Sequence, residues 1–441
     1  MKAPDIVGYK FSKEYYADAI NRFVVRDRQP LQRPLTAKEF EVLIFFLERP
    51  RVTIRREDIE PLHEVSRAGP RHPADDYIKE LRSKLDMPEL FVTVSKAGYR
   101  LNSVVRPVTS VDRTKAGEFC RAAAMHFNEH TMISMRAAVQ DCLNAISLDP
   151  HGVPQAYIIL AYANINLGHV GYCGDLPANT IPNAKKAAET VLAEQPDSAE
   201  ALGILGLIAL IWEYDWTKAE KFLSEALELD PEEASMLLTL AHLKVTQGQT
   251  QAAIDYVERA VQADPLDKIV HSSRGWIYLL AGKVKKAKEL MDESASRFPE
   301  FARGHFLRAL VCEAFQDYEE ALKSFETALR FEEMAVALTG LGHLHALMGK
   351  RNLALSTLER LDELHKKREI AYLSGYCEAL IYVGLGQTEK CIKGLRRAYE
   401  ERCDWLIHLG VDPRWAPVRS HPGFKELMSK IGIKHVTKFP K

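Results

Sequence analysis

A spacing of about 34 residues recurs through most of this 441-residue chain, and it constrains the fold more than any other feature. Four prolines follow the spacing, with intervals of 35, 34 and 34 residues, and they are Pro196, Pro231, Pro265 and Pro299. Small residues keep the same interval in further rows, which are Ala219, Ala253, Ala287 and Ala321, then Ala226, Ala260, Ser294 and Ala328, then Gly206, Ala241, Gly275, Ala309, Gly342 and Ala379. Because small side chains let helices approach closely and proline cannot continue a helix, these rows predict a repeated pair of packed helices.

This period is the signature of the tetratricopeptide repeat, in which each unit is a pair of helices and neighbouring units stack into a solenoid. The expected units are 119–152, 153–199, 200–233, 234–267, 268–301, 302–335 and 336–371, with a degenerate eighth from Tyr372 to Cys403. We therefore expect a solenoid over 119–403, with an insertion at 168–180 that forms a loop, and a C-terminal tail, 404–441, that packs on the last repeat. Such arrays generally bind a peptide or a helix of a partner in their concave groove.

Composition and cysteine usage indicate the compartment. The chain has 59 Lys+Arg and 60 Asp+Glu, which excludes an obligate polycation and a disordered acidic chain. No apolar run approaches the roughly 20 residues of a membrane helix, and no secretory leader is evident. Seven cysteines at irregular spacing, without a CxxC pair, favour free thiols in a reducing cytoplasm. We predict a cytoplasmic protein without membrane contact, and we expect Cys173, in the glycine-rich insertion, to be its most exposed thiol.

The first hundred residues differ from the repeats. Residues 1–106 carry 20 Lys+Arg and 16 Asp+Glu, a net charge of +4, whereas the remainder carries −5. Short alternating stretches within 9–33 predict a small antiparallel sheet. Thr36 and Glu39 form a capping box, and a helix begins there because apolar residues follow at helical spacing, namely Phe40, Leu43, Ile44 and Leu47.

Two further helices and a hairpin complete this region. The second helix is expected from about Arg55 to Leu62 and the third from Pro73 to Leu85. The inward face of the third helix should comprise Ala74, Ile78, Leu81 and Leu85. Residues 91–94 and 99–101 flank a turn and predict a β-hairpin. A sheet, three helices and a hairpin follow one another in the order of a winged helix. The expected fold class is mainly α, with an α+β winged helix at 1–106, a linker at 107–118 and then the all-α solenoid.

Four stretches of residues 1–106 carry a family resemblance. They are Leu35 to Leu43 (LTAKEFEVL), Arg56 to Ile59 (REDI), Tyr77 to Leu85 (YIKELRSKL) and Thr93 to Leu101 (TVSKAGYRL). Together they resemble the OmpR/PhoB-type winged-helix DNA-binding domain. The order of winged helix and then tetratricopeptide array is similar to that of HilA-like and CadC-type transcription regulators.

The resemblance implies that the third helix enters the major groove of double-stranded DNA and that the hairpin, or wing, contacts the minor groove. The groove-facing candidates are His72, Tyr77, Lys79 and Arg82. Lys84 would contact phosphate, and Thr93, Lys96 and Arg100 lie at or beside the wing. Cationic side chains release counterions from phosphates, and arginine can bind guanine through two hydrogen bonds. The chain is thus expected to be a cytoplasmic transcriptional regulator.

Three departures from the family pattern keep an alternative open. Glu80 repels phosphate, Ser95 stands where many members have a wing arginine, and Pro61 falls inside the second helix. The alternative is an interaction scaffold whose degenerate winged helix no longer binds DNA. In both cases the array would bind an unidentified protein or a second copy of the chain. No phosphate-binding loop, zinc-protease motif or nucleophile elbow occurs, so we predict that the chain is not an enzyme and uses no cofactor or metal.

Overall fold

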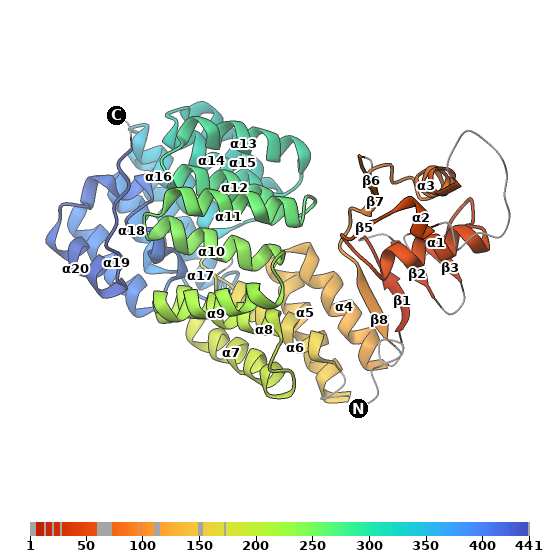
Figure 1. Ribbon diagram of the computed structural model, residues 1–441. Helices are drawn as coiled ribbons and strands as arrows, with labels where there is room; N and C mark the ends of the chain where they lie inside the picture. The colour runs from red at the N-terminus through yellow and green to blue at the C-terminus, as the bar shows by residue number, and fades with distance from the viewer. Residues whose placement is uncertain are drawn as a thin grey trace. The chain divides into compact units, whose positions relative to one another are not determined.

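The computed structural model describes residues 6–12, 15–19, 22–26, 29–59, 73–95, 97–109, 115–148, 153–171 and 173–439 (Figure 1). Contacts divide the chain into two compact units, residues 1–118 and residues 119–441.

The first unit contains two antiparallel sheets. One has the strand order β4-β3-β2-β1-β8, and its strands are β1 (Ile6–Lys10), β2 (Tyr15–Asp18), β3 (Phe23–Arg26), β4 (Gln29–Pro30) and β8 (Arg106–Thr109). The other has the order β5-β7-β6, from β5 (Thr53–Ile54), β6 (Phe91–Val94) and β7 (Gly98–Leu101). The β6–β7 hairpin confirms the expected wing. Strand β8 includes residues 107–109 of the expected linker, and it pairs with β1.

Three helices pack between these sheets and share one apolar core. They are α1 (Ala37–Leu47), α2 (Arg56–Ile59) and α3 (Pro73–Lys84). The expected inward residues of α3 are all buried, and they contact the apolar face of α1, including Leu43 and Phe46, and the wing residue Phe91. The capping box is confirmed, because Thr36 accepts from the Glu39 N–H at 3.3 Å while its own N–H donates to the Glu39 carboxylate at 2.6 Å.

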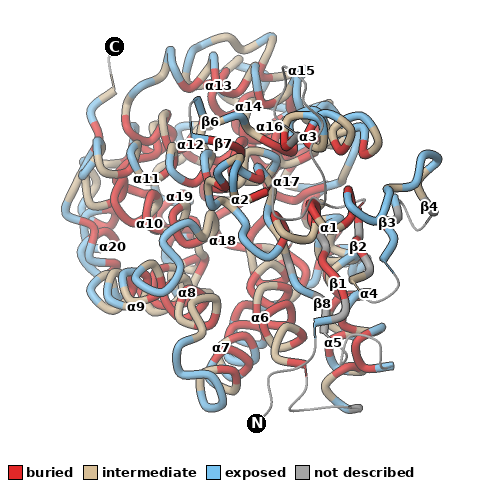
Figure 2. Tube along the Cα trace, turned by 45° about the vertical axis from the view of Figure 1, so that its right-hand side comes forward, coloured by how far each residue is buried: buried red, intermediate tan, exposed pale blue. Residues whose placement is uncertain are grey.

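The second unit is a stack of helix pairs. The described helices are α4 (Lys115–Glu129), α5 (Met132–Leu148), α6 (Pro154–Gly168), α7 (Pro177–Glu194), α8 (Ala199–Ile208), α9 (Trp216–Leu229), α10 (Ala234–Thr246), α11 (Thr250–Ala263), α12 (Lys268–Leu280), α13 (Val284–Arg297), α14 (Ala302–Ala314), α15 (Tyr318–Phe331), α16 (Ala335–Leu347), α17 (Arg351–Lys366), α18 (Gly375–Gly384) and α19 (Thr388–Glu400). A π-helical turn, Ala209–Glu213, extends α8. Figure 2 shows buried residues in red along one side of these helices and exposed residues in pale blue along the other. The all-helical solenoid is as expected.

The rows of small residues lie where the two helices of a pair cross. A Cβ added to Gly206 of α8 would lie 2.7 Å from Leu223 of α9. At the equivalent place, a Cβ on Gly275 of α12 would lie 2.3 Å from the sulfur of Met291 in α13. A larger residue at Gly206 would have to displace Leu223, and one at Gly275 would have to displace Met291, so the small residues favour the close approach of the paired helices.

The loop between α6 and α7 is shorter than the expected insertion, and its described residues Val170, Gly171, Cys173 and Gly174 are buried. Pro177 starts α7, since proline suits the first turn of a helix, and so residues 177–180 are helical. Our expectation for Cys173 is wrong, because its side chain is fully buried. Its thiol donates to the Val170 carbonyl at 3.1 Å, and its own carbonyl accepts from the Ala371 N–H at 2.8 Å. The loop is therefore held against the segment that leads into α18.

The tail returns along the array after α19. It comprises the 3-10 turns η4 (Asp404–His408) and η5 (Pro413–Val418), the helix α20 (Pro422–Ile431) and an extended end. The tail contacts α18 through η5 and α19 through α20. It also contacts the first helices of earlier pairs: the Trp405 ring lies 5.7 Å from those of Trp276 in α12 and Phe306 in α14.

Polar groups anchor the tail at further points of the array, on α9, α10 and α12. The Trp216 indole N–H donates to the Ile431 carbonyl at 2.7 Å, and the Thr437 hydroxyl donates to the Leu280 carbonyl at 3.1 Å. His408 lies 3.3 Å from His242 of α10, measured between ring nitrogens. Burial lowers the pKa of His408 to about 3 and also lowers that of His242, so two neutral imidazoles meet. The inner side formed by the first helices is thus filled by the chain itself.

Buried thiols should resist a charged, polar thiol reagent in the folded protein. All seven cysteines are buried, and burial raises the pKa of Cys312 to about 11 and that of Cys391 to about 12. Because the thiolate is the reactive form, we expect slow reaction when folded and seven reactive thiols after denaturation. A Ser296→Cys variant, at an exposed position, supplies the positive control. A fast thiol that disappears in Cys173→Ser would contradict the buried loop.

Removing the Trp405 side chain should destabilise the array as a whole. The expected loss is about 3–5 kcal/mol, as for other large-to-small changes in cores, because Trp405 joins the tail to three helices. Denaturant unfolding followed by far-UV circular dichroism measures it, and the transition should also become less cooperative. Leu266→Ala, at a side chain that is 58% exposed, is the control and should change little. If the two substitutions lowered the free energy of unfolding equally, the contacts of Trp405 would contribute no more to stability than an exposed side chain does.

Candidate nucleic-acid interface

Helix α3 presents one apolar and one polar face. Pro73 occupies its start, and Asp75 and Asp76 lie in its first turn, where negative charge suits the helix dipole. The buried face packs on α1 as described above. The opposite face exposes Asp76, Lys79 and Ser83 to solvent. The helix is thus held by its core side while its polar side stays accessible.

Polar contacts link α3 to the wing at both ends. Near the start of α3, the Asp75 carboxylate accepts from the Tyr99 hydroxyl at 2.6 Å and from the Arg56 guanidinium at 2.8 Å. Burial and the neighbouring Asp75 raise the pKa of Tyr99, so its hydroxyl stays protonated and can donate. Near the end of α3, Arg82 Nη2 donates to the Phe91 carbonyl at 2.5 Å and lies 3.4 Å from the Thr93 hydroxyl. Helix α2, α3 and the hairpin therefore form one linked body.

The residues expected to bind DNA differ in their exposure to solvent and in their contacts with the rest of the protein. Lys79 and Arg100 are exposed, and within the described ranges neither has an ion-pair partner. Thr93 is exposed beside Arg82. Tyr77 is half-buried, and burial followed by the charges of Glu39 and Glu41 raises its pKa. His72 and Lys96 lie outside the described residues, as does Pro61.

Lys84 is engaged inside the protein. Its ammonium lies 2.7 Å from the Glu39 carboxylate, and the two side chains are 12% and 8% exposed. Burial raises the pKa of Glu39, but hydrogen bonds from Lys84 and Thr36 outweigh this effect and leave the pKa below its ordinary value. The same carboxylate thus caps α1 and holds the last turn of α3. A phosphate contact by Lys84 stays a prediction, and it would have to compete with this ion pair.

Arg82 has a structural as well as a candidate binding role. Its described hydrogen bonds both use Nη2, and its buried Nε has no hydrogen-bond partner. An arginine side chain holds five N–H donors, and in Arg82 the Nη2 group is the one that holds β6.

The polar side of α3 also carries negative charge. Glu80 lies 3.8 Å from Arg33, which donates to the Ser83 hydroxyl at 3.3 Å as well. Arg33 precedes Ser83 by fifty residues, and no local pattern predicts that it lies beside α3. Its charge offsets part of the repulsion that Glu80 would exert on phosphate.

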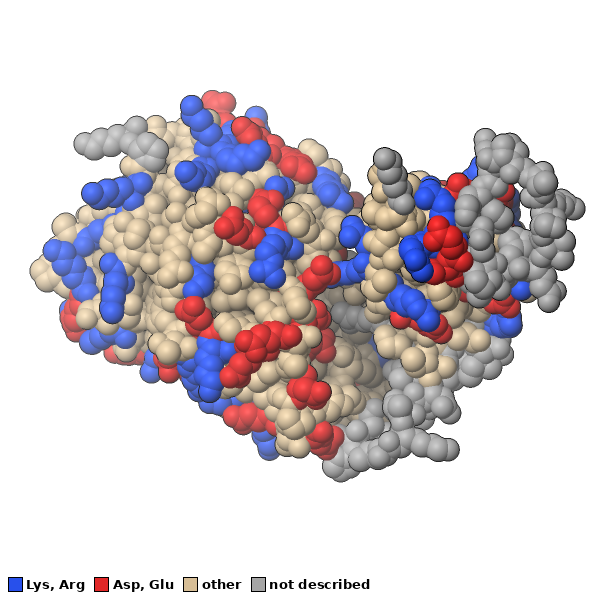
Figure 3. Space-filling model, viewed as in Figure 1, with Lys and Arg blue, Asp and Glu red and all other residues tan. Residues whose placement is uncertain are grey.

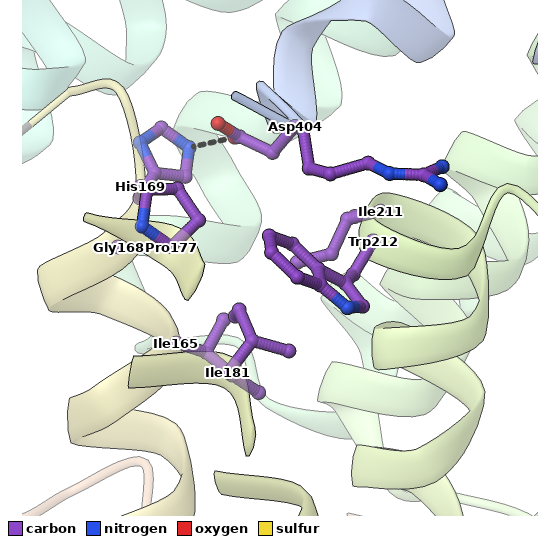
Figure 4. A pocket seen from close by; sticks show the side chains of 9 residues that line it. Ile165, Gly168, His169, Pro177, Ile181, Ile211, Trp212 and Asp404 are labelled. Carbon is purple, nitrogen blue, oxygen red and sulfur yellow. Dashed lines mark ion pairs between the residues drawn. The ribbon is translucent and has the colours of Figure 1, made fainter. Parts of the chain in front are cut away.

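A small cavity lies between α6, α7, the π-helical turn and the start of the tail. It has a volume of about 10 Å³ and lies beside His169, Ile181, Trp212 and Asp404 (Figure 4). His169 Nε2 lies 3.0 Å from the Asp404 carboxylate, and the indole nitrogen of Trp405 lies 3.2 Å from the same ring nitrogen. His169 Nδ1 accepts from the Gly171 N–H at 2.8 Å. Such a space holds about one water. Within the described residues no cluster of three metal-ligating side chains occurs, and no helix is long and apolar enough to cross a membrane.

Comparisons with known families agree with this architecture. A family described as the C-terminal domain of transcriptional regulatory proteins matches residues 31–101. Tetratricopeptide repeat families match residues 210–277, 178–234 and 281–333. These domain types are generally not enzymes.

Individual relatives are similar over parts of the array. Anaphase-promoting complex subunit 7 of Dictyostelium discoideum is 30% identical over 101 residues, which are 23% of this chain and 17% of that protein. A DnaJ homolog subfamily C member 7 homolog of Schizosaccharomyces pombe is 25% identical over 170 residues, 35% of this chain and 36% of that protein. The chain therefore spans only a small part of the length of these relatives.

Among solved structures, the anaphase-promoting complex hetero-tetramer Cut9–Hcn1 is similar over 90% of this chain and 62% of the matched chain, at 14% identity and with a TM-score of 0.47.

The family matches lead to one description: the chain carries an OmpR/PhoB-type winged-helix domain of the transcriptional regulatory protein family, followed by a tetratricopeptide repeat array.

Proposed function

We propose that this chain is a cytoplasmic transcriptional regulator that binds promoter DNA through α3 and the wing. The main support is the body formed by α2, α3 and the hairpin, which leaves the cations of Lys79 and Arg100 exposed and unpaired within the described residues. A preformed helix–wing body binds without a large ordering cost. The partner is double-stranded DNA, with α3 in the major groove and the wing at the minor groove.

The candidate residues divide by accessibility. Lys79 on α3 and Arg100 on β7 are free to neutralise phosphates, and Thr93 can donate a hydroxyl hydrogen bond. Arg82 combines wing support with a candidate base contact. Tyr77, which is half-buried, would contact DNA through the edge of its ring. His72, Lys84 and Lys96 stay in the proposal because the chain resembles the OmpR/PhoB-type domain at these positions.

The repeats serve protein interaction or self-association in this proposal. The inner side of the array, where a partner peptide would ordinarily lie, is occupied by Trp405, His408 and the rest of the tail. A partner would therefore bind another face, unless the tail leaves first. The buried aromatic contacts of the tail make its departure costly.

An interaction scaffold with a winged helix that does not bind DNA is the second candidate. Asp76 and Glu80 on the polar side of α3 favour it, as does the internal ion pair of Lys84. Selection of DNA fragments from a random duplex pool by the full-length protein decides between the two. Enrichment of one motif supports the regulator, whereas absence of binding at low salt leaves the scaffold.

Substitution of either exposed cation should weaken DNA binding and its salt dependence. For Lys79→Ala or Arg100→Ala, the slope of log affinity against log salt should fall in magnitude by about 0.9 per lost phosphate contact. Fluorescence anisotropy with the selected duplex, measured over a series of salt concentrations, gives these slopes. Lys38→Ala, which removes an exposed cation of α1, is the matched control. If Lys38→Ala lowered the salt dependence of the affinity by the same amount, the assignment of the phosphate contacts to Lys79 and Arg100 would be wrong.

Arg82→Ala should cost about 1–3 kcal/mol on the selected motif and less on unrelated DNA, if Arg82 binds guanine. Hydrogen exchange of β6 in the same variant reports whether the wing has loosened. A loss that is equal on all sequences, together with faster exchange in β6, would show that Arg82 only holds the wing. Lys84→Met is the companion variant, and a uniform loss of affinity is expected there if Lys84 reaches phosphate.

A further inference from the structure

The end of the chain differs in charge from the array on which it packs. Residues 107–441 carry 39 Lys+Arg and 44 Asp+Glu, but residues 419–441 contribute six of these cations and only one of the acids, Glu426. The array proper is thus acidic and its last segment is basic. On the face drawn in Figure 3, blue side chains gather over α19 and α20, at the left of the view.

A cleft lies within this basic segment, between α20 and the extended residues that follow it. Its volume is about 340 Å³. Three cationic side chains line it, those of Arg419, Lys425 and Lys434, and its apolar lining includes Met428, Ile433 and Val436. Val436 is 40% exposed, so part of the apolar lining is open to solvent.

None of the three cations has an ion-pair partner among the described residues, although the charge of the Asp412 carboxylate acts on Arg419. Lys425 and Lys434 are exposed, whereas the nearby Lys430 is paired with Glu426 at 2.7 Å and does not line the cleft.

Arg419 donates only to neutral acceptors, the carbonyls of Asp412 at 2.8 Å and Thr437 at 3.0 Å, and its Nε is buried without a partner. Burial also lowers the pKa of Arg419. A partly buried cation held by two carbonyls is incompletely compensated, and an incoming anion would compensate it.

We propose that this cleft binds an acidic segment of a partner protein, with carboxylates on Arg419, Lys425 and Lys434 and an apolar side chain on Met428, Ile433 and Val436. The apolar lining favours a peptide over the DNA backbone, which has no apolar side chain to bury. The volume is at the lower end for ligand sites and suits one or two side chains of an extended segment. This assignment does not depend on DNA binding by the winged helix.

Fluorescence anisotropy with the full-length protein tests the proposal. The probe is a labelled short peptide of alternating glutamate and leucine. Saturable binding at low salt is expected, and the double variant Lys425→Ser/Lys434→Ser should weaken it by about tenfold, because two exposed ion pairs with the peptide are lost. Lys285→Ser/Lys367→Ser removes two exposed lysines of the array and is the matched control, with affinity expected to stay unchanged.

Two further probes separate the charge contribution from the apolar one. Replacing leucine by serine in the peptide should weaken binding, as should replacing glutamate by glutamine. The proposal is overturned by any of three results: no saturable binding, equal weakening by the control variant, or equal affinity for the peptide without leucine. Displacement of the peptide from the wild-type cleft by duplex DNA, with the same dependence on Lys425 and Lys434, would assign the cleft to nucleic acid instead.

Discussion

The close approach of paired helices at small residues is the constraint on which most of this structure depends. At Gly206 and Gly275 the partner side chain lies too near for any Cβ, and the buried alanines of the same rows keep the spacing in the other pairs. Repeating this crossing curves the stack until early and late repeats meet: the Met132 N–H donates to the Glu332 carboxylate at 3.4 Å, and the Cys173 carbonyl accepts from the Ala371 N–H. The curvature leaves an inner side that must be covered, and the tail covers it.

Because the chain's own tail fills the inner side, the array differs from an open solenoid in its cooperativity of unfolding and in the surfaces that it leaves exposed. An open solenoid depends on nearest-neighbour contacts and can lose its repeats one at a time. Here the Trp405 ring, which lies against those of Trp276 and Tyr376, and Arg414, which donates to the Tyr376 hydroxyl at 3.1 Å, tie the tail to distant repeats. The surfaces left for partners are then the outer helices, the ends of the stack and the basic cleft beside α20.

In the winged-helix unit, several charged side chains hold the helices and the wing together, and these side chains are therefore less accessible to a partner. Glu39 serves both the cap of α1 and the ion pair with Lys84, and Arg82 is shared between α3 and β6. Groups used in this way hold α3 and the wing in one geometry, but their charge is less available to the DNA that we propose as the partner. The exposed cations Lys79 and Arg100 have no such second task among the described residues, so the proposed phosphate contacts rest mainly on them.

Local patterns in the sequence determined the elements of both units. The capping box at Thr36, the apolar stripe of α3, the β6–β7 hairpin and the 34-residue rows each depend on neighbours within one or two turns or one repeat, and the structure confirms them. Tertiary structure alone decided the contacts that join residues far apart in the chain. Lys84 is paired with Glu39, Arg33 lies beside α3, Cys173 is buried under residue 371, and the tail reaches α12 as well as α19. No periodicity encodes such pairings, because they arise only when the packed helices bring these side chains within a few ångströms of one another.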